Sequence, residues 1–236
     1  MKIRLPALFV IAFIVGLAAC KKKYDDAPTV VSKVKLNIIN ASADTINIYR
    51  NGSRLNTTSA ILPGYFTAYY DVPEGKQIFE VKKPFNVNTN VVQNLFSITL
   101  PADTNFYRTL FVTDEKADDA FTTPDVFKTD TVTATRDSTC FLRLVNSSAG
   151  SGSLDMTFGS TTVSSNIPFK GHSDFTLVNT YKGASVTGLI ALKIFNTGSG
   201  TPLYIDSVSL NPGTNYTVYT LGTPGTTGFN IGFKPD

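Results

Sequence analysis

The chain has 236 residues, among them 21 lysines and arginines, 18 aspartates and glutamates, one histidine and two cysteines. A charge balance this close to neutral, with no basic stripe interleaved with aromatic residues, argues against nucleic acid as a partner. One histidine and two cysteines are too few ligands for a zinc site. We therefore expect neither a structural metal nor a cofactor.

The N-terminus has the three parts of a secretory signal peptide. A short basic start is followed by an apolar stretch over 5–17 and then by two alanines. The apolar stretch is shorter than the roughly 20 residues that a membrane-spanning helix needs. We predict a signal peptide over 1–19, cleaved between Ala19 and Cys20.

The cleavage region, Leu17-Ala18-Ala19-Cys20, resembles the lipobox of bacterial lipoproteins. In that family the cysteine thiol receives a diacylglycerol, and the new amino terminus is acylated after cleavage. The resemblance implies a lipid on Cys20, a tether over 20–32 and a membrane as partner, because two or three acyl chains hold a protein durably. We expect a cell-envelope location in the outer membrane, with the periplasmic and the surface face both open. An ordinary secretory signal with a chance cysteine is the alternative.

Beyond the tether the chain is rich in Thr, Val, Ile, Phe and Tyr, with frequent Gly, Pro and Asn, which is typical of short strands joined by tight turns. Asn51-Gly52 is a strong hairpin signal. The strands predicted in the first half cover residues 33–40, 45–50, 65–71, 76–82, 94–100 and 105–113. Those predicted in the second half cover residues 140–146, 153–159, 173–179, 189–196, 203–210 and 214–221.

The two halves repeat one sequence pattern. Residues 36–42 (LNIINAS) match residues 142–148 (LRLVNSS), at an offset of 106 from Leu36 to Leu142. Such a period is the size of a domain and too long for a solenoid, whose repeats run roughly 20–50 residues. We predict an all-β chain of two tandem immunoglobulin-like β-sandwiches. The first domain is predicted over 33–113, a linker over 114–137 and the second domain over 138–236.

The openings of the two copies, VKLNIINAS…INIYRNG and FLRLVNSS…LDMTFG, together with the closing segment ADTNFYRTLFVT, resemble the family of the domain of unknown function 4397. That family occurs singly or in tandem in bacterial envelope proteins. The resemblance covers nearly the whole mature chain and implies the fold and the envelope location. It assigns no activity and no catalytic residues. The second copy departs from the pattern at Gly159, where the first has Asn-Gly.

Candidate catalytic chemistry is sparse. His172, the only histidine, lies in the sequence FKGHSD, and we interpret it as an exposed loop residue. Cys140 begins a predicted strand and is expected to be a core thiol. The acidic residues over 114–119 lack the spacing of an EF-hand loop, so a solvated linker is favoured over an ion site. We therefore predict that the chain is not an enzyme.

The candidate ligand-binding residues lie in the tyrosine-rich segment 65–70 (YFTAYY). In a strand Tyr65 and Tyr69 share one face, so these two form the predicted ligand face. Tyrosine rows of this kind stack on sugar rings or form protein interfaces, although tyrosine also simply favours strands. We expect a non-catalytic binding, adhesion or structural module. The alternative is an accessory glycan-binding lipoprotein of a nutrient-uptake system, and a glycan and a protein ligand both stay open.

Overall fold

The computed structural model describes residues 33–84, 94–101, 107–113, 120–128, 138–180 and 188–236. The predicted signal peptide and tether, with Ala19 and Cys20, lie outside these residues. In the part of the chain that is described, no helix is long and apolar enough to cross a membrane.

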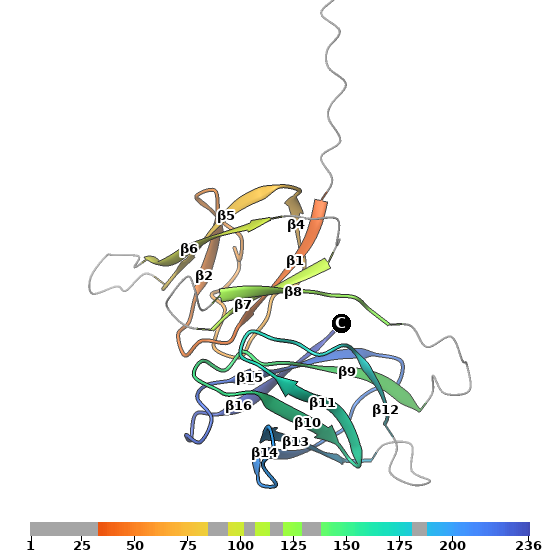
Figure 1. The fold of residues 1–236 in the computed structure, drawn as a ribbon. Helices are drawn as coiled ribbons and strands as arrows, with labels where there is room; N and C mark the ends of the chain where they lie inside the picture. Colours follow the sequence, from red (N-terminus) through yellow and green to blue (C-terminus); the bar gives the residue numbers. More distant parts are fainter. Residues whose placement is uncertain (1–32, 85–93, 102–106, 114–119, 129–137, 181–187) are drawn as a thin grey trace, which may run out of the picture. The chain divides into compact units, whose positions relative to one another are not determined.

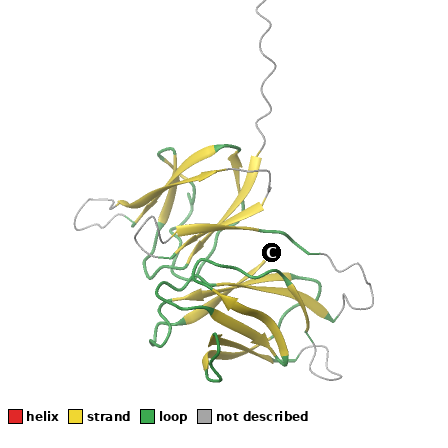
Figure 2. Cartoon of the chain, viewed as in Figure 1, coloured by secondary structure: helices red, strands yellow, loops and turns green. Residues whose placement is uncertain are grey.

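The described residues form sixteen β-strands (Figure 2). The first eight are β1 (Lys33–Asn40), β2 (Asn47–Arg50), β3 (Ser53–Arg54), β4 (Tyr70–Pro73), β5 (Lys76–Lys82), β6 (Asn94–Pro101), β7 (Tyr107–Val112) and β8 (Ala120–Pro124). The second eight are β9 (Thr139–Val145), β10 (Leu154–Phe158), β11 (Thr161–Ile167), β12 (Thr176–Asn179), β13 (Ile190–Asn196), β14 (Pro202–Val208), β15 (Asn215–Leu221) and β16 (Asn230–Pro235).

Each set of eight strands forms two sheets with the same strand order. The first sandwich consists of sheets β4-β1-β7-β8 and β3-β2-β5-β6, and the second of β12-β9-β15-β16 and β11-β10-β13-β14 (Figure 1). In both, the opening strand pairs antiparallel with the fourth strand and parallel with the seventh. The prediction of an all-β chain with two tandem sandwiches is confirmed.

Two differences between the predicted and the observed bounds bear on the site. Strand β8 lies within the predicted linker over 114–137, yet it pairs with β7 and belongs to the first sandwich. Its inward residues, Ala120 and Thr122, are small, so the strand lacks the apolar alternation that marks a strand in sequence. The strand predicted over 65–71 begins only at Tyr70, because the residues before it bond irregularly to β1.

Strands β1 and β9 are buried on both faces. Leu36 and Ile38 point into the core of the first sandwich, whereas Ile39 points outward and is still fully buried. Its cover is an interdomain apolar cluster, made of Ile39, Ala41 and Phe111 from the first sandwich and Val145 and Tyr219 from the second. The outward face of β1 is therefore covered by the second sandwich and does not face solvent at Ile39.

Cys140 lies in the core of the second sandwich, as predicted, and is fully buried. Burial raises the pKa of its thiol to about 12. The thiolate is the reactive form of cysteine, so a buried thiol with a raised pKa is inert in the folded protein.

We expect a Cys20→Ala form, in which Cys140 is the only cysteine, to resist alkylation by iodoacetamide at pH 8 while folded. Denaturant should expose the thiol and allow one label per chain, measured by intact mass. Rapid stoichiometric labelling of the folded protein would show that Cys140 is accessible.

Candidate functional site

A groove with a volume of about 610 Å³ opens on the first sandwich, between the loop over 55–62 and the segment over 65–70. Its lining residues are Leu55, Asn56, Thr57, Thr58, Ser59, Ala60, Ile61, Leu62, Tyr65, Phe66, Thr67, Ala68 and Tyr70. Three of them are large apolar residues with a substantial exposed fraction: Leu62 at 49%, Tyr65 at 63% and Phe66 at 40%. Volumes of this size are usual for small-molecule sites.

Asn56 holds the loop that forms one wall. Its buried amide accepts a hydrogen bond from the Ile48 backbone at 2.9 Å and donates to the Ser59 carbonyl at 2.7 Å. Further along, Ile61 exchanges two backbone hydrogen bonds with Ile46, at 2.9 and 2.8 Å. The loop is therefore fastened at both ends to β2, and its exposed Thr and Ser side chains stand between these two anchor points.

The opposite wall is fixed to β1. Gly64 adopts a positive φ of 77°, which favours glycine, and its N–H donates to the Asn40 carbonyl at 2.7 Å. Asn40 then donates its N–H to the Tyr65 carbonyl at 2.9 Å, and Thr67 donates its N–H to Ile38 at 2.9 Å. Because the backbone of this segment is held by β1, the exposed rings of Tyr65 and Phe66 have a firm base.

The second sandwich also supports this wall. The Tyr219 hydroxyl donates to the Gly64 carbonyl at 2.8 Å, and a methyl group of Leu221 lies 3.1 Å from the place where a Gly64 side chain would begin. Gly64 is thus restricted both by its backbone conformation and by its neighbours.

The groove has a structural origin that the repeat reveals. In the second sandwich β11 runs for seven residues beside β10, and Thr176 at the start of β12 donates to the Val163 carbonyl of β11 at 2.9 Å. In the first sandwich the corresponding strand, β3, has two residues. Tyr70 occupies the register position of Thr176, since Tyr70 pairs with Leu36 as Thr176 pairs with Leu142. The first copy is open where the second is closed by a strand.

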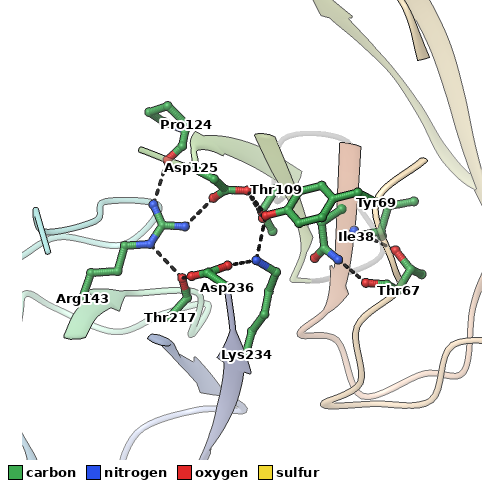
Figure 3. Close-up of polar contacts among 11 residues, drawn as sticks. Ile38, Thr67, Tyr69, Thr109, Pro124, Asp125, Arg143, Thr217, Lys234 and Asp236 are labelled. Carbon is green, nitrogen blue, oxygen red and sulfur yellow. Dashed lines mark hydrogen bonds and ion pairs between the residues drawn. The ribbon is translucent and has the colours of Figure 1, made fainter. Parts of the chain in front are cut away.

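The structure separates the two tyrosines that alternation had placed on one face. Tyr65 lines the groove, whereas Tyr69 does not and directs its hydroxyl to Asp125, donating at 2.8 Å (Figure 3). Alternation fails here because residues 65–69 are not a regular strand. The second groove tyrosine is Tyr70, whose pKa is raised by burial.

Tyr69 belongs to an interdomain polar cluster that also contains Thr109, Asp125, Arg143, Thr217, Lys234 and Asp236 (Figure 3). Arg143 of β9 forms an ion pair with Asp125, and their side chains are 2% and 0% exposed. The Arg143 guanidinium also donates to the Pro124 carbonyl at 2.7 Å and to the Thr217 hydroxyl at 2.8 Å. These bonds satisfy a buried cation whose desolvation is costly when it is unpaired.

Lys234 of β16 provides the second buried cation of the cluster. Its ammonium pairs with Asp236 and donates to the Tyr69 hydroxyl at 2.9 Å. Burial raises the pKa of the Tyr69 phenol well above its ordinary value, and the negative charge of Asp125 adds to this effect. Tyr69 therefore stays neutral and serves as a hydrogen-bond bridge between the two sandwiches.

A repeated Pro-Asp pair underlies the cluster. Asp125 follows Pro124 at the end of β8, and Asp236 follows Pro235 at the end of β16. Each aspartate accepts a hydrogen bond from the matching threonine of the neighbouring strand, at 2.7 Å from Thr109 and at 2.6 Å from Thr217. This repeat was visible in the sequence, but sequence reasoning had assigned the first pair to the linker and missed it.

His172 and the acidic residues over 114–119 were the other candidates for chemistry in the sequence. His172 is exposed and bridges to Val145, with a ring nitrogen 3.2 Å from the Ser173 carbonyl oxygen. The acidic residues over 114–119 lie outside the described ranges. Within those ranges no group of three or more His, Cys, Asp or Glu side chains is placed to hold a metal ion.

The sequence profile of the family described as domain of unknown function (DUF4397) matches residues 34–157, more than half of the chain. A predicted cell adhesion protein from Bacteroides uniformis is 13% identical, with 89% of this chain and 99% of that chain covered and a TM-score of 0.24. A family 26 carbohydrate-binding module from Eubacterium rectale, solved with maltoheptaose, is 12% identical, with 84% and 96% covered and a TM-score of 0.26. No match is found among curated proteins. The identification of the chain rests on the family match.

Asp125→Asn should lower the free energy of unfolding by about 3–5 kcal/mol, because it leaves Arg143 charged and buried without its partner. Urea denaturation followed by circular dichroism measures the loss. Asp71→Asn is the matched control, since Asp71 pairs with Lys33 and Lys35 on the exposed surface and should leave stability nearly unchanged. Equal stability of the two variants would contradict the structural role of the buried pair.

A second prediction concerns the pH dependence of stability. Burial, opposed by Asp125 and reinforced by Arg143, lowers the pKa of Lys234 to about 8 from 10.5. Below pH 8 the folded state bears the cost of a buried charge, and this cost disappears as the pH rises to 10.5. The free energy of unfolding of the wild type should therefore rise across this window relative to Lys234→Met, in urea titrations at each pH. A difference that stays constant with pH would contradict the lowered pKa.

Proposed function

We propose that this chain, which belongs to the DUF4397 family, is a lipid-anchored protein of the bacterial cell envelope that binds a ligand in the groove of its first sandwich and catalyses no reaction. The observation that carries the proposal is the groove itself. It gathers three exposed large apolar residues on the sandwich whose strand at this place, β3, has only two residues. Clustered apolar surface of this kind on a folded protein marks a binding site.

The chemistry of the groove favours binding over catalysis. Among the described residues, those that line it carry hydroxyl, amide, aromatic and aliphatic groups and supply no carboxylate, imidazole, amine or thiol. Ser, Thr and Tyr hydroxyls can act as nucleophiles, but they are activated by an adjacent general base, and the described lining supplies no carboxylate, imidazole or amine for that role. Hydrogen bonding and apolar contact remain as the means of interaction.

The interdomain apolar and polar clusters hold the groove in place for a membrane-anchored binding protein. They join the two sandwiches through buried apolar side chains and through paired charges. The groove wall at Gly64 is part of this joint, since Tyr219 donates to its carbonyl. A joint of this type keeps the groove formed without a ligand, which lowers the entropic cost of binding.

The anchor is supported by the sequence Leu17-Ala18-Ala19-Cys20, the proposed site of cleavage and lipidation. The tether over 20–32 then separates the lipid from β1. We propose the outer membrane as the location of the protein.

Membrane fractionation of cells that make the wild type and a Cys20→Ala variant tests the anchor. The wild type should remain with the membranes until detergent is added, because its acyl chains partition into the bilayer. The Cys20→Ala variant should not require detergent for release. Release of the wild type by buffer or salt alone would contradict lipid anchoring.

Protease treatment of the same intact cells then reports which face of the outer membrane holds the protein. Digestion of the wild type indicates a ligand met outside the cell, and protection until the cells are opened indicates a periplasmic ligand. A periplasmic control protein must stay intact in the same samples.

A further inference from the structure

The groove of the first sandwich has the lining of a site for an uncharged carbohydrate, and we propose that it binds a neutral glycan. This inference rests on the proposed function and names the class of ligand for the same groove. Three observations carry it. The described lining residues have no charge, one wall is aromatic while the other carries hydroxyl groups, and the backbone hydrogen bonds at the neighbouring edge of β2 are already filled.

The lining residues select against charged ligands. All of those described are uncharged, and Arg54, whose charge acts on Tyr70, does not line the groove. A ligand with a phosphate, sulfate or carboxylate would leave that group without a charged partner on partly desolvated surface. A neutral ligand avoids this cost.

The two walls offer complementary groups. One wall has the exposed hydroxyl side chains Thr57, Thr58 and Ser59, and each hydroxyl both donates and accepts hydrogen bonds. The other has the rings of Tyr65, Phe66 and Tyr70. A sugar ring has hydroxyl groups at its rim and C–H groups on its faces, so it matches an aromatic surface beside a row of hydroxyls.

The neighbouring sheet edge argues against a peptide that binds as an added strand. Strand addition requires free backbone groups at a sheet edge. On this side of β2, Ile46 is paired with Ile61, the Ile48 carbonyl accepts from Leu55, and the Ile48 N–H donates to the Asn56 side chain. These backbone bonds at and beside β2 are filled within the chain, so a peptide cannot add a strand at this edge.

The repeat supplies an internal comparison. In the second sandwich β11 lies beside β10 and is linked to β12 through Thr176 and Val163, in place of an open groove. The inference therefore assigns glycan binding to the first sandwich and to one site in the described part of the chain.

The test is affinity electrophoresis of the purified lipoprotein in detergent, through gels that contain a neutral α-glucan, β-glucan, mannan or arabinoxylan, or the charged polymers polygalacturonate and heparin. We expect at least one neutral polysaccharide to retard the wild type and the charged polymers not to do so. Tyr65→Ala should weaken retardation about tenfold, and Tyr65→Phe should preserve it, because the ring face makes the contact.

Ile78→Ala is the matched control, because Ile78 is 51% exposed on β5 of the same sandwich and does not line the groove. It should bind as the wild type does, and circular dichroism should show all variants folded. Retardation by no neutral polysaccharide, or only by the charged polymers, would overturn the carbohydrate inference. Binding of a charged polymer that Tyr65→Ala abolishes would overturn it while leaving the groove as a ligand site. Retardation that Tyr65→Ala leaves unchanged would overturn both the carbohydrate inference for this groove and the groove as a ligand site.

Discussion

The ion pair between Asp125 and Arg143 is the contact on which the joint between the two sandwiches depends. The two residues lie on opposite sides of the joint, and neither side chain reaches solvent. A buried charge is tolerated only when its partner and its hydrogen bonds are in place. Replacement of either residue in the intact chain would leave the other charge buried without its partner, so the pair stabilises the joint.

The same joint also holds the wall of the groove. Asp125 also accepts from Tyr69, whose hydroxyl receives a hydrogen bond from Lys234 of the second sandwich. A few residues earlier in the chain, Gly64 accepts from Tyr219. The segment that carries the groove rings is therefore held by the second sandwich at both of its ends. The two copies thus differ at this strand: β11 has seven residues in the second sandwich, whereas β3 has two in the first, where the groove opens.

The sequence predicted the repeated architecture well, because the core strands keep their apolar alternation in both copies. It predicted Cys140 as a core thiol for the same reason. Strands β3, β8, β11 and β16 were not predicted; β3 has two residues, and the other three carry only one or two large apolar residues each. Each of them pairs with the strand that precedes it, but so few large apolar residues give little periodicity to read in the sequence.

The candidate site was only partly predictable. The tyrosine-rich segment indicated recognition, and Tyr65 does line the groove. Tyr69 was placed wrongly, since strand alternation was applied to residues that bond irregularly to β1. The loop over 55–62 gave no signal by itself. Its importance follows from the shortness of β3, which becomes evident only when β3 is compared with β11.

The place of β1 in its sheet has a mechanical consequence. This strand begins directly after the tether, lies between β4 and β7 and runs parallel to β7. A pull between a ligand in the groove and a lipid on Cys20 would enter the fold along β1, to which the groove wall is bonded at Ile38 and Asn40. Hydrogen bonds perpendicular to such a pull are loaded together and must break together. Such a pull would pass between the groove wall and β1 through the bonds at Ile38 and Asn40, which lie within the first sandwich.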